Sequence, residues 1–386
     1  MDLAILAKEL YTPLDRIEHP VLLIQEGVIE SIVTLAEREV PKARRVLDLG
    51  DSTLVPGFID MHIHGGAGRD IMDTAPDALP AVERLLYAHG VTTYFPTTIT
   101  APMDRTLQSL EHLGQAIERA AESQELRARP VGIHLEGPFI SHARPGVHPQ
   151  ADLQLPSLPL FEKMWEASRG TVKVITIAPE LPGARELVSE ATRRGVCVSM
   201  GHSDADLAQA QAGVDAGVRH ATHTFNAMRP LDHRNPGIIG ETLTDKRISA
   251  EIIADGIHVD PVVVRLFLRA KGAEGAVLVT DATAATGMPN GRYMLGSLEV
   301  EVKDGKCLRD GRLAGSVLTM DKAVRNIVKF ANWDLKDAVR LATLNPARTT
   351  GLPGNTGQLI AGAPADIVAL NPAGEVVKTI VRGQAA

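Results

Sequence analysis

Short apolar runs alternate with longer amphipathic stretches through the middle of the chain. The apolar runs have the length and β-branched composition of buried strands, and the stretches between them repeat apolar residues at helical spacing. The expected strands are Val55–His64, Thr92–Thr97, Val131–Glu136, Val172–Ala178, Val196–His202, His220–Phe225, Ile248–Ala254 and Ala276–Asp281. Among the expected helices are Pro80–His89, Met103–Glu122, Leu181–Arg194, Asp204–Ala216 and Pro261–Lys271.

This alternation predicts an α/β fold with a parallel sheet, and eight such strands match a (β/α)8 TIM barrel. We place the barrel at 54–347. A later β segment, Arg292–Leu313, contains the turn-like Lys303-Asp304-Gly305-Lys306. It predicts a β-hairpin inserted after the last barrel strand.

The two chain ends, 1–53 and 348–386, contain short β segments instead. A hairpin pattern around Gly27 in the first segment is matched by Ala365–Leu370 and Val376–Val381 in the second. Two such small segments cannot each bury a hydrophobic core. We therefore expect both ends to pack together as one small, discontinuous β-sandwich domain.

Composition narrows the class of protein. The chain has 386 residues, of which 44% are hydrophobic, enough for a large core, and its net charge of −7 disfavours a nucleic-acid partner. Two cysteines allow no disulfide framework and fit a reducing cytoplasm. The first residues lack the features of a signal peptide and no apolar run is long enough to span a bilayer. We therefore expect a cytoplasmic protein without a membrane partner.

Ionisable residues recur at the ends of the apolar runs. The first run, Pro56-Gly57-Phe58-Ile59-Asp60-Met61-His62-Ile63-His64, ends in His-x-His. Alternate residues of a strand share a face, so His62 and His64 point the same way and can hold one metal ion. Neighbouring histidines are also common as ordinary polar residues beside a turn, so the chain must supply further ligands.

Four more ionisable residues end other expected strands or lie near their ends: Glu136, His202, His223 and Asp281. The carboxyl ends of barrel strands form the active-site face, so we expect these side chains to converge with the histidine pair. Imidazole and carboxylate ligands without thiolate suit a catalytic Zn²⁺ or Fe²⁺ site. Ser203 is expected to cap the helix that follows His202. His220 is expected to face away from His223.

Six motifs, in this order, resemble those of the N-acetylglucosamine-6-phosphate deacetylases of the amidohydrolase superfamily. They are Pro56-Gly57-Phe58-Ile59-Asp60, His134-Leu135-Glu136-Gly137-Pro138-Phe139, Gly201-His202-Ser203-Asp204-Ala205, Thr222-His223-Thr224-Phe225-Asn226-Ala227-Met228, Asp255-Gly256-Ile257-His258 and Val279-Thr280-Asp281-Ala282-Thr283. The resemblance implies a homodimer that hydrolyses the N-acetyl amide of the sugar phosphate. It also implies a metal ion on Glu136, His202 and His223. Because the chain keeps His62 and His64, the number of divalent ions bound, one or two, stays open.

The predicted roles of the other site residues come partly from chemistry and partly from this resemblance. Asp281 suits a group that takes a proton from water and returns it to the leaving amine. The resemblance implies a phosphate contact for Arg234, which is equally typical of a surface loop, and leaves open whether Arg234 serves its own site or a partner subunit's. It implies further substrate contacts, which are Val147, His148, Asn226, Ala227, His258, Leu313, Ala314 and Gly315.

Two other functions stay open at this point. Another amidohydrolase, such as a cyclic-amide hydrolase or an N-acyl-amino-acid deacetylase, would share the metal site and differ in its pocket. A catalytically inactive barrel that serves as a scaffold would typically have lost metal ligands, whereas every ligand position is filled here.

Overall fold

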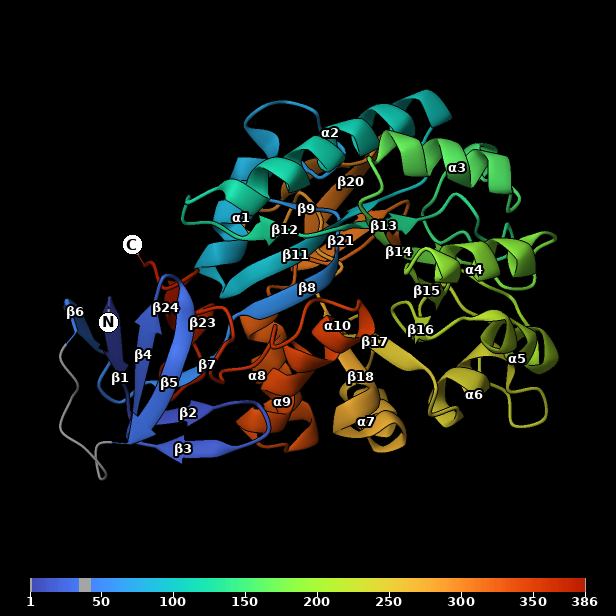
Figure 1. Ribbon diagram of the computed structural model, residues 1–386. Coiled ribbons are helices and arrows are strands. Elements are labelled where there is room, and N and C mark those ends of the chain that lie inside the picture. The colour runs from blue at the N-terminus through green and yellow to red at the C-terminus, as the bar shows by residue number, and fades with distance from the viewer. Residues whose placement is uncertain (1, 35–42, 386) are drawn as a thin grey trace.

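The computed structural model describes residues 2–34 and 43–385. A barrel of strands ringed by helices lies beside a pair of β-sheets that contains both chain termini (Figure 1). The predicted fold class, a TIM barrel with a small β-sandwich formed by both chain ends, is thereby confirmed. The exact division into domains stays a prediction.

Eight strands of the described chain form the barrel, and each corresponds to an expected strand. They are β8 (Phe58–Ile63), β11 (Val91–Thr98), β13 (Ile133–Glu136), β14 (Val172–Ile177), β15 (Cys197–Met200), β16 (His220–Ala221), β17 (Ser249–Ile253) and β18 (Ala276–Val279). Neighbours in this order pair in parallel, and β12 (Arg129–Pro130) also pairs with β11. A parallel bridge between Ile63 and Ala282 joins the first strand to the segment after the last at the carboxyl ends.

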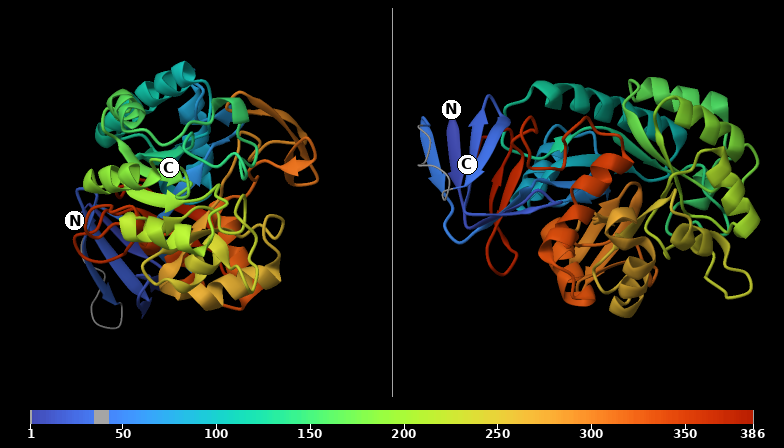
Figure 2. Two further views of the ribbon diagram at one scale, coloured as in Figure 1. Left: turned by 90° about the vertical axis from the view of Figure 1, so that its right-hand side faces the viewer. Right: turned by 60° about the horizontal axis from the view of Figure 1, so that its bottom comes forward.

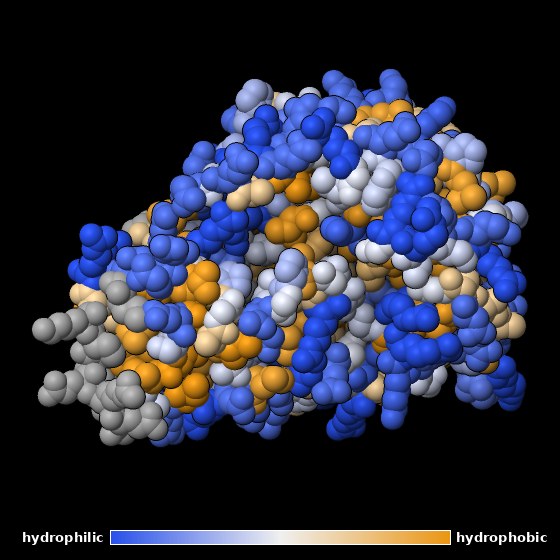
Figure 3. All heavy atoms as spheres, in the orientation of Figure 1, coloured by the Kyte–Doolittle hydropathy of each residue, from blue (hydrophilic) through white to orange (hydrophobic). Residues whose placement is uncertain are grey.

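Helices surround these strands in all three views (Figures 1 and 2). In α2, Thr106, Leu110 and Leu113 are buried at helical spacing, and the surface over this helix is mainly hydrophilic (Figure 3). None of the described helices is both long and apolar enough to cross a membrane. The helices are α1 (Ala78–Ala88), α2 (Met103–Glu122), η1 (Gln150–Asp152), α3 (Leu158–Ala167), α4 (Ala184–Arg193), α5 (Leu207–Ala216), α6 (Gly237–Thr244), α7 (Pro261–Gly275), α8 (Met320–Ala331), α9 (Leu335–Leu341) and α10 (Leu344–Thr349).

The chain ends form two sheets. One has the order β5 (Val28–Thr34), β4 (Pro20–Gln25), β1 (Leu3–Leu6), β6 (Arg45–Asp48). The other has the order β24 (Val376–Ile380), β23 (Ile367–Leu370), β7 (Thr53–Pro56), β2 (Glu9–Tyr11), β3 (Arg16–Glu18). Ile5, Leu22, Leu54 and Ile367 belong to one buried cluster, so strands from both chain ends share a core.

The segment expected as one hairpin is a four-stranded antiparallel sheet, made of β19 (Gly291–Leu295), β20 (Leu298–Lys303), β21 (Lys306–Arg309) and β22 (Arg312–Leu313). It extends from the barrel in Figure 2. Its apolar face packs on Met72 and Ile99. These residues lie beside the barrel mouth, so the inserted sheet becomes one wall of the site described below. A two-stranded sheet, β9 (Gly65–Gly66) with β10 (Arg69–Asp70), adjoins the first barrel strand.

Three further local predictions were wrong. The run Val55–His64 is two strands, split at Gly57, where a Cβ would lie 2.2 Å from the Thr92 hydroxyl oxygen. The run His220–Phe225 is a strand only over its first two residues, because the chain then turns into the loop that carries His223.

The third error concerns the cap of α5. Asp206, not Ser203, accepts from the backbone of Gln209 at the start of this helix, and the Gln209 side chain completes a capping box. The Ser203 hydroxyl donates to Glu180 instead, at 2.7 Å. The residue after His202 is therefore fixed to the neighbouring loop.

Candidate active site

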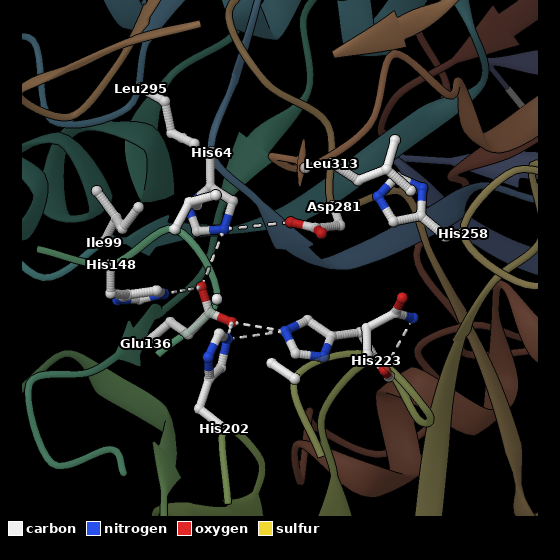
Figure 4. A pocket seen from close by; sticks show the side chains of 15 residues that line it. His64, Ile99, Glu136, His148, His202, His223, His258, Asp281, Leu295 and Leu313 are labelled. Atoms are coloured by element: carbon white, nitrogen blue, oxygen red, sulfur yellow. Dashed lines mark hydrogen bonds and ion pairs between the residues drawn. The ribbon is translucent and has the colours of Figure 1, made fainter. Parts of the chain in front are cut away.

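A pocket with an empty volume of about 590 Å³ opens at the carboxyl ends of the barrel strands. Its lining includes His64, Glu136, His202, His223 and Asp281 (Figure 4). His62 is fully buried behind them, with its Nε2 atom 3.3 Å from Nε2 of His64. The structure therefore brings together all the side chains that the strand-end pattern selected.

The backbone is unusual where three of these residues leave their strands. His202, His223 and Asp281 have φ angles of +46°, +24° and +49°, in the left-handed region that residues other than glycine rarely occupy. Such strain concentrates at functional sites. Each of the three side chains points into the pocket (Figure 4).

Hydrogen bonds at Nδ1 orient two of the histidine rings. His64 Nδ1 donates to the Thr97 carbonyl oxygen, and His202 Nδ1 donates to the Arg144 carbonyl oxygen, each at 3.1 Å. A carbonyl oxygen only accepts, so both Nδ1 atoms carry a proton and each Nε2 can present a lone pair to the pocket. This is the ring orientation that a metal ligand requires.

Glu136 lies at the centre of the cluster (Figure 4). Its Oε1 atom is 3.1 Å from Nε2 of His202 and 2.9 Å from Nε2 of His223, and its Oε2 atom is 3.1 Å from Nε2 of His64. Asp281 Oδ1 is 3.3 Å from the same His64 nitrogen. The Nε2 atoms of His202 and His223 lie 3.1 Å apart. Carboxylate oxygens and nitrogen lone pairs this close together repel unless positive charge lies among them.

The pKa shifts show the same demand for a cation. Burial alone would lower the pKa of His64, but hydrogen bonds to Asp281 and Glu136 raise it to about 9. Burial likewise opposes ionisation of Glu136, yet the His62 charge and hydrogen bonds from neighbouring histidines hold its pKa well below its usual value.

A divalent ion among these atoms would supply that positive charge. The donor set of imidazole and carboxylate fits a divalent transition-metal ion. His62, His64 and Asp281 form one group of converging ligand atoms, and His62, Glu136 and His223 form another. The site therefore has ligands for one ion or two.

His148 holds its ring proton on the other nitrogen. The Thr100 backbone N–H donates to His148 Nδ1 at 3.3 Å, and the Thr100 hydroxyl lies 2.8 Å from the same atom. Nδ1 therefore accepts, and Nε2, 3.4 Å from Glu136 Oε2, carries the proton. Burial lowers the pKa of His148 to about 4. His148 can therefore donate a hydrogen bond to a molecule bound in the pocket. It does not suit a metal ion, because its Nε2 atom carries a proton and has no lone pair to offer.

The remaining predicted substrate residues divide into two groups. His258 lines the pocket and donates from Nδ1 to Asp255 at 2.7 Å, and Ala314 is buried between two lining residues. Arg234 is exposed and lies outside the set of described residues that line the pocket. The other predicted residues in the lining are Val147, Asn226, Ala227, Leu313 and Gly315.

Sequence reasoning missed three partners of the site: Thr100, Glu251 and Asp60. Asp60 accepts from the Thr280 hydroxyl at 2.6 Å, and burial raises its pKa to about 7. A signal did exist for Glu251, because a carboxylate inside an apolar strand is rarely buried without partners. Thr100 carried no such signal, since its role depends on where a loop places its backbone N–H.

A (β/α)8 barrel with imidazole and carboxylate groups converging at its strand ends is typical of the metal-dependent hydrolases. The chain belongs to the amidohydrolase family, whose sequence pattern matches residues 53–386, and within it to the group of N-acetylglucosamine-6-phosphate deacetylases. Members of this family generally depend on divalent metal ions. The resemblance seen in the sequence motifs is thereby confirmed.

Relatives and solved structures cover nearly the whole chain. The N-acetylglucosamine-6-phosphate deacetylase of Bacillus subtilis is 37% identical over 94% of this chain and 91% of its own length. An Escherichia coli relative, named N-acetylgalactosamine-6-phosphate deacetylase, is 36% identical over 98% of both chains. The Mycobacterium smegmatis deacetylase, solved as a mutant in complex with N-acetyl-D-glucosamine-6-phosphate, is 34% identical with a TM-score of 0.93, covering 99% of this chain and 98% of that one.

Proposed function

We propose that this protein removes the acetyl group of N-acetylglucosamine 6-phosphate, giving acetate and glucosamine 6-phosphate, in the catabolism or recycling of amino sugars. One observation carries the proposal. The pocket presents a carboxylate, Asp281, and a neutral N–H donor, His148, on opposite sides of the ligand cluster around Glu136 (Figure 4). These groups suit amide hydrolysis, because one can move protons and the other can stabilise the charge that develops on the carbonyl oxygen.

We propose that Glu136, His202 and His223 hold a divalent ion, with His62, His64 and Asp281 available for a second. Zn²⁺ and Fe²⁺ suit these ligands best. When bound, such an ion supplies Lewis-acid polarisation of a carbonyl and lowers the pKa of water from 15.7 towards about 7.

Asp281 accepts a proton from the attacking water and delivers it to the leaving nitrogen, because an amide anion is a very poor leaving group. Burial opposes its ionisation, but positive charge beside the carboxylate favours it. A hydrogen bond from His64 and the charge of His62 hold the pKa of Asp281 below its usual value, and a bound ion would act in the same direction. Asp281 is therefore ready to accept a proton at neutral pH. His148 donates from Nε2 to the acetyl oxygen, where negative charge develops.

The phosphate requires a cation, and we propose Arg234 for this role. Its guanidinium geometry suits phosphate. Arg234 is exposed, lies outside the pocket of its own chain and is close in sequence to Leu231, an apolar residue that is 48% exposed. We therefore propose that Arg234 serves the site of a partner subunit in a homodimer. Asn226 and Ala227 lie in the pocket lining. We propose that their backbone completes the phosphate site.

We further propose a cytoplasmic location. Both cysteines, Cys197 and Cys307, are free thiols, and burial raises the pKa of each. Unreactive free thiols are compatible with a reducing compartment.

The test is hydrolysis by metal-reconstituted enzyme of four compounds. These are N-acetylglucosamine 6-phosphate, N-acetylgalactosamine 6-phosphate, unphosphorylated N-acetylglucosamine and an N-acetyl amino acid. We expect the highest kcat/KM for the first. Preference for the amino acid would favour another amidohydrolase activity, and absence of both bound metal and hydrolysis would favour a scaffold.

A further inference from the structure

A chain of buried polar side chains runs from the metal-ligand cluster towards the amino-terminal ends of the barrel strands. His62 Nδ1 is 2.9 Å from Glu251 Oε2, and Glu251 Oε1 is 3.2 Å from His220 Nε2. His220 Nδ1 is 2.7 Å from the Ser249 hydroxyl, which in turn accepts from the Thr349 hydroxyl at 3.0 Å. Ser249 and Thr349 line a separate surface pocket, so the chain ends at solvent.

The donor and acceptor roles in this chain follow from its chemistry. A carboxylate only accepts, so the protons lie on His62 Nδ1 and His220 Nε2. In neutral His220 the Nδ1 atom then accepts from Ser249, whose hydroxyl also lies 3.3 Å from the Arg219 carbonyl oxygen. With its Nδ1 proton held by Glu251, His62 has Nε2 as its metal-binding atom. That atom lies 3.3 Å from His64 Nε2 and 3.6 Å from Asp281 Oδ1.

Glu251 differs from the groups that orient the other histidines. Backbone carbonyls hold His64 and His202, whereas a fully buried carboxylate holds His62. Glu251 Oε2 also accepts the backbone N–H of His223 at 2.9 Å. One carboxylate thus fixes a side chain of the His-x-His pair and the backbone of His223, which lies in the loop after another strand.

The residues around Glu251 do not form a metal site of their own. Glu251 lies with His62 and His134 in a third group of close potential ligands. His134 Nδ1, however, donates to the Met61 carbonyl oxygen at 3.1 Å, and its Nε2 accepts from the Thr176 hydroxyl at 2.8 Å. Neither nitrogen of that ring has a lone pair to offer.

We propose that Glu251 is a positioning residue for the metal site, which holds the ring proton of His62 on Nδ1 and thereby makes Nε2 its ligand atom. His220 and Ser249 hold Glu251 in turn. The inference rests on the proposed metal-dependent function and adds a determinant of metal affinity outside the ligand set. Carboxylate partners of metal-binding histidines commonly change affinity 10–100-fold when they are removed.

The test compares Glu251→Gln, His62→Asn and the double variant, each stripped of metal and titrated with Zn²⁺ against a chromophoric chelator. Glutamine has one acceptor oxygen and an NH₂ group, so it cannot accept from all three N–H groups that now face Glu251. We expect Glu251→Gln to weaken Zn²⁺ binding about 10–100-fold at the position that includes His62. In the His62→Asn background the same substitution should have little further effect.

Proton NMR of the Zn²⁺-loaded protein supplies a readout that a merely structural role would leave unchanged. We expect a downfield ring N–H resonance that is absent in His62→Asn and is shifted or lost by exchange in Glu251→Gln. Glu83→Gln is the matched control, because Glu83 is a buried carboxylate held by Tyr94 and Arg127 instead of by the site. Its Zn²⁺ affinity should equal that of the wild type.

Ser249→Ala removes only one hydroxyl, at the far end of the hydrogen-bonded row of side chains. It replaces Glu251→Gln as the test variant if Glu251→Gln does not fold. It should weaken Zn²⁺ binding in the same direction by a smaller factor. Wild-type affinity in both variants, or additive losses in the double variant, would overturn the proposal. Neither measurement uses the sugar. A failed deacetylase assay would therefore refute the proposed activity without affecting the test of Glu251.

Discussion

Asp281→Asn separates the proton-transfer chemistry from the architecture of the site. Asparagine has nearly the same shape as aspartate and, among residues other than glycine, is one of the most tolerant of the left-handed φ of +49° found here. Its amide oxygen can still face His64. The substitution therefore removes the ionisable carboxylate with little change in the backbone, and the ion proposed on Glu136, His202 and His223 should stay bound.

The size of the effect follows from the two roles assigned to Asp281. General acid–base catalysis typically contributes 10²–10⁴-fold, and this carboxylate acts both when water attacks and when the amine leaves. We expect kcat to fall by about 10⁴, towards the top of that range, which corresponds to roughly 5 kcal/mol of transition-state stabilisation. KM should change much less, because the proton transfers belong to the reaction step.

The assay is acetate release from N-acetylglucosamine 6-phosphate, with metal content measured on the same sample. Asp321→Asn is the matched control. Asp321 is also a buried aspartate, but it pairs with His89 and Arg325 at the start of α8. Its kcat should equal that of the wild type. An Asp281→Asn protein that retains metal and keeps kcat within tenfold of the wild type would refute the assignment.

The remaining predictions concern stability, substrate choice and metal. Burial opposes ionisation of Asp321, but hydrogen bonds from His89 and Arg325 hold its pKa well below its usual value. The ionised Asp321 therefore stabilises the fold above the unfolded pKa of about 3.9. That contribution is lost as the pH falls below this value. Urea unfolding should show Asp321→Asn less stable by about 2 kcal/mol at pH 7, with the difference shrinking below pH 4, and a constant difference would contradict this account. Arg234→Ala should raise KM at least about tenfold for the phosphorylated sugar and leave it unchanged for the unphosphorylated one, and equal effects would remove Arg234 from the phosphate site. Chelation should abolish hydrolysis and lower the Tm, and added Zn²⁺ or Fe²⁺ should restore both, whereas full activity in metal-free protein would exclude the metal-dependent reaction.

The barrel could be predicted because its signal is local and repeated. Each apolar run such as Val172–Ala178 has the length of a buried strand, and each is followed by a helical period, so errors at single boundaries do not change the fold. The errors arose where tertiary contacts decide. Gly57 divides an apolar run because Thr92 packs against it, and the segment from Gly291 to Leu313 adds two more strands to its hairpin.

The site could be predicted in part for a similar reason. Parallel strands bring their carboxyl ends to one face, so Glu136, His202 and His223 could be grouped by their position at strand ends alone. Arg234 illustrates the limit. Its residue type suggests a phosphate contact, but its position in an exposed loop outside the pocket depends on the path of the chain and on any partner subunit.

The proton positions on the histidines show most clearly what tertiary structure adds. His148 and His202 are the same residue type in the same pocket, with ring centroids 4.6 Å apart. The Thr100 backbone N–H makes Nδ1 of His148 an acceptor, whereas the Arg144 carbonyl makes Nδ1 of His202 a donor. The first ring therefore presents a proton to the pocket and the second can present a lone pair. Because a main-chain group decides each case, substituting the Thr100 or Arg144 side chain should disturb these roles less than moving the loops that carry them.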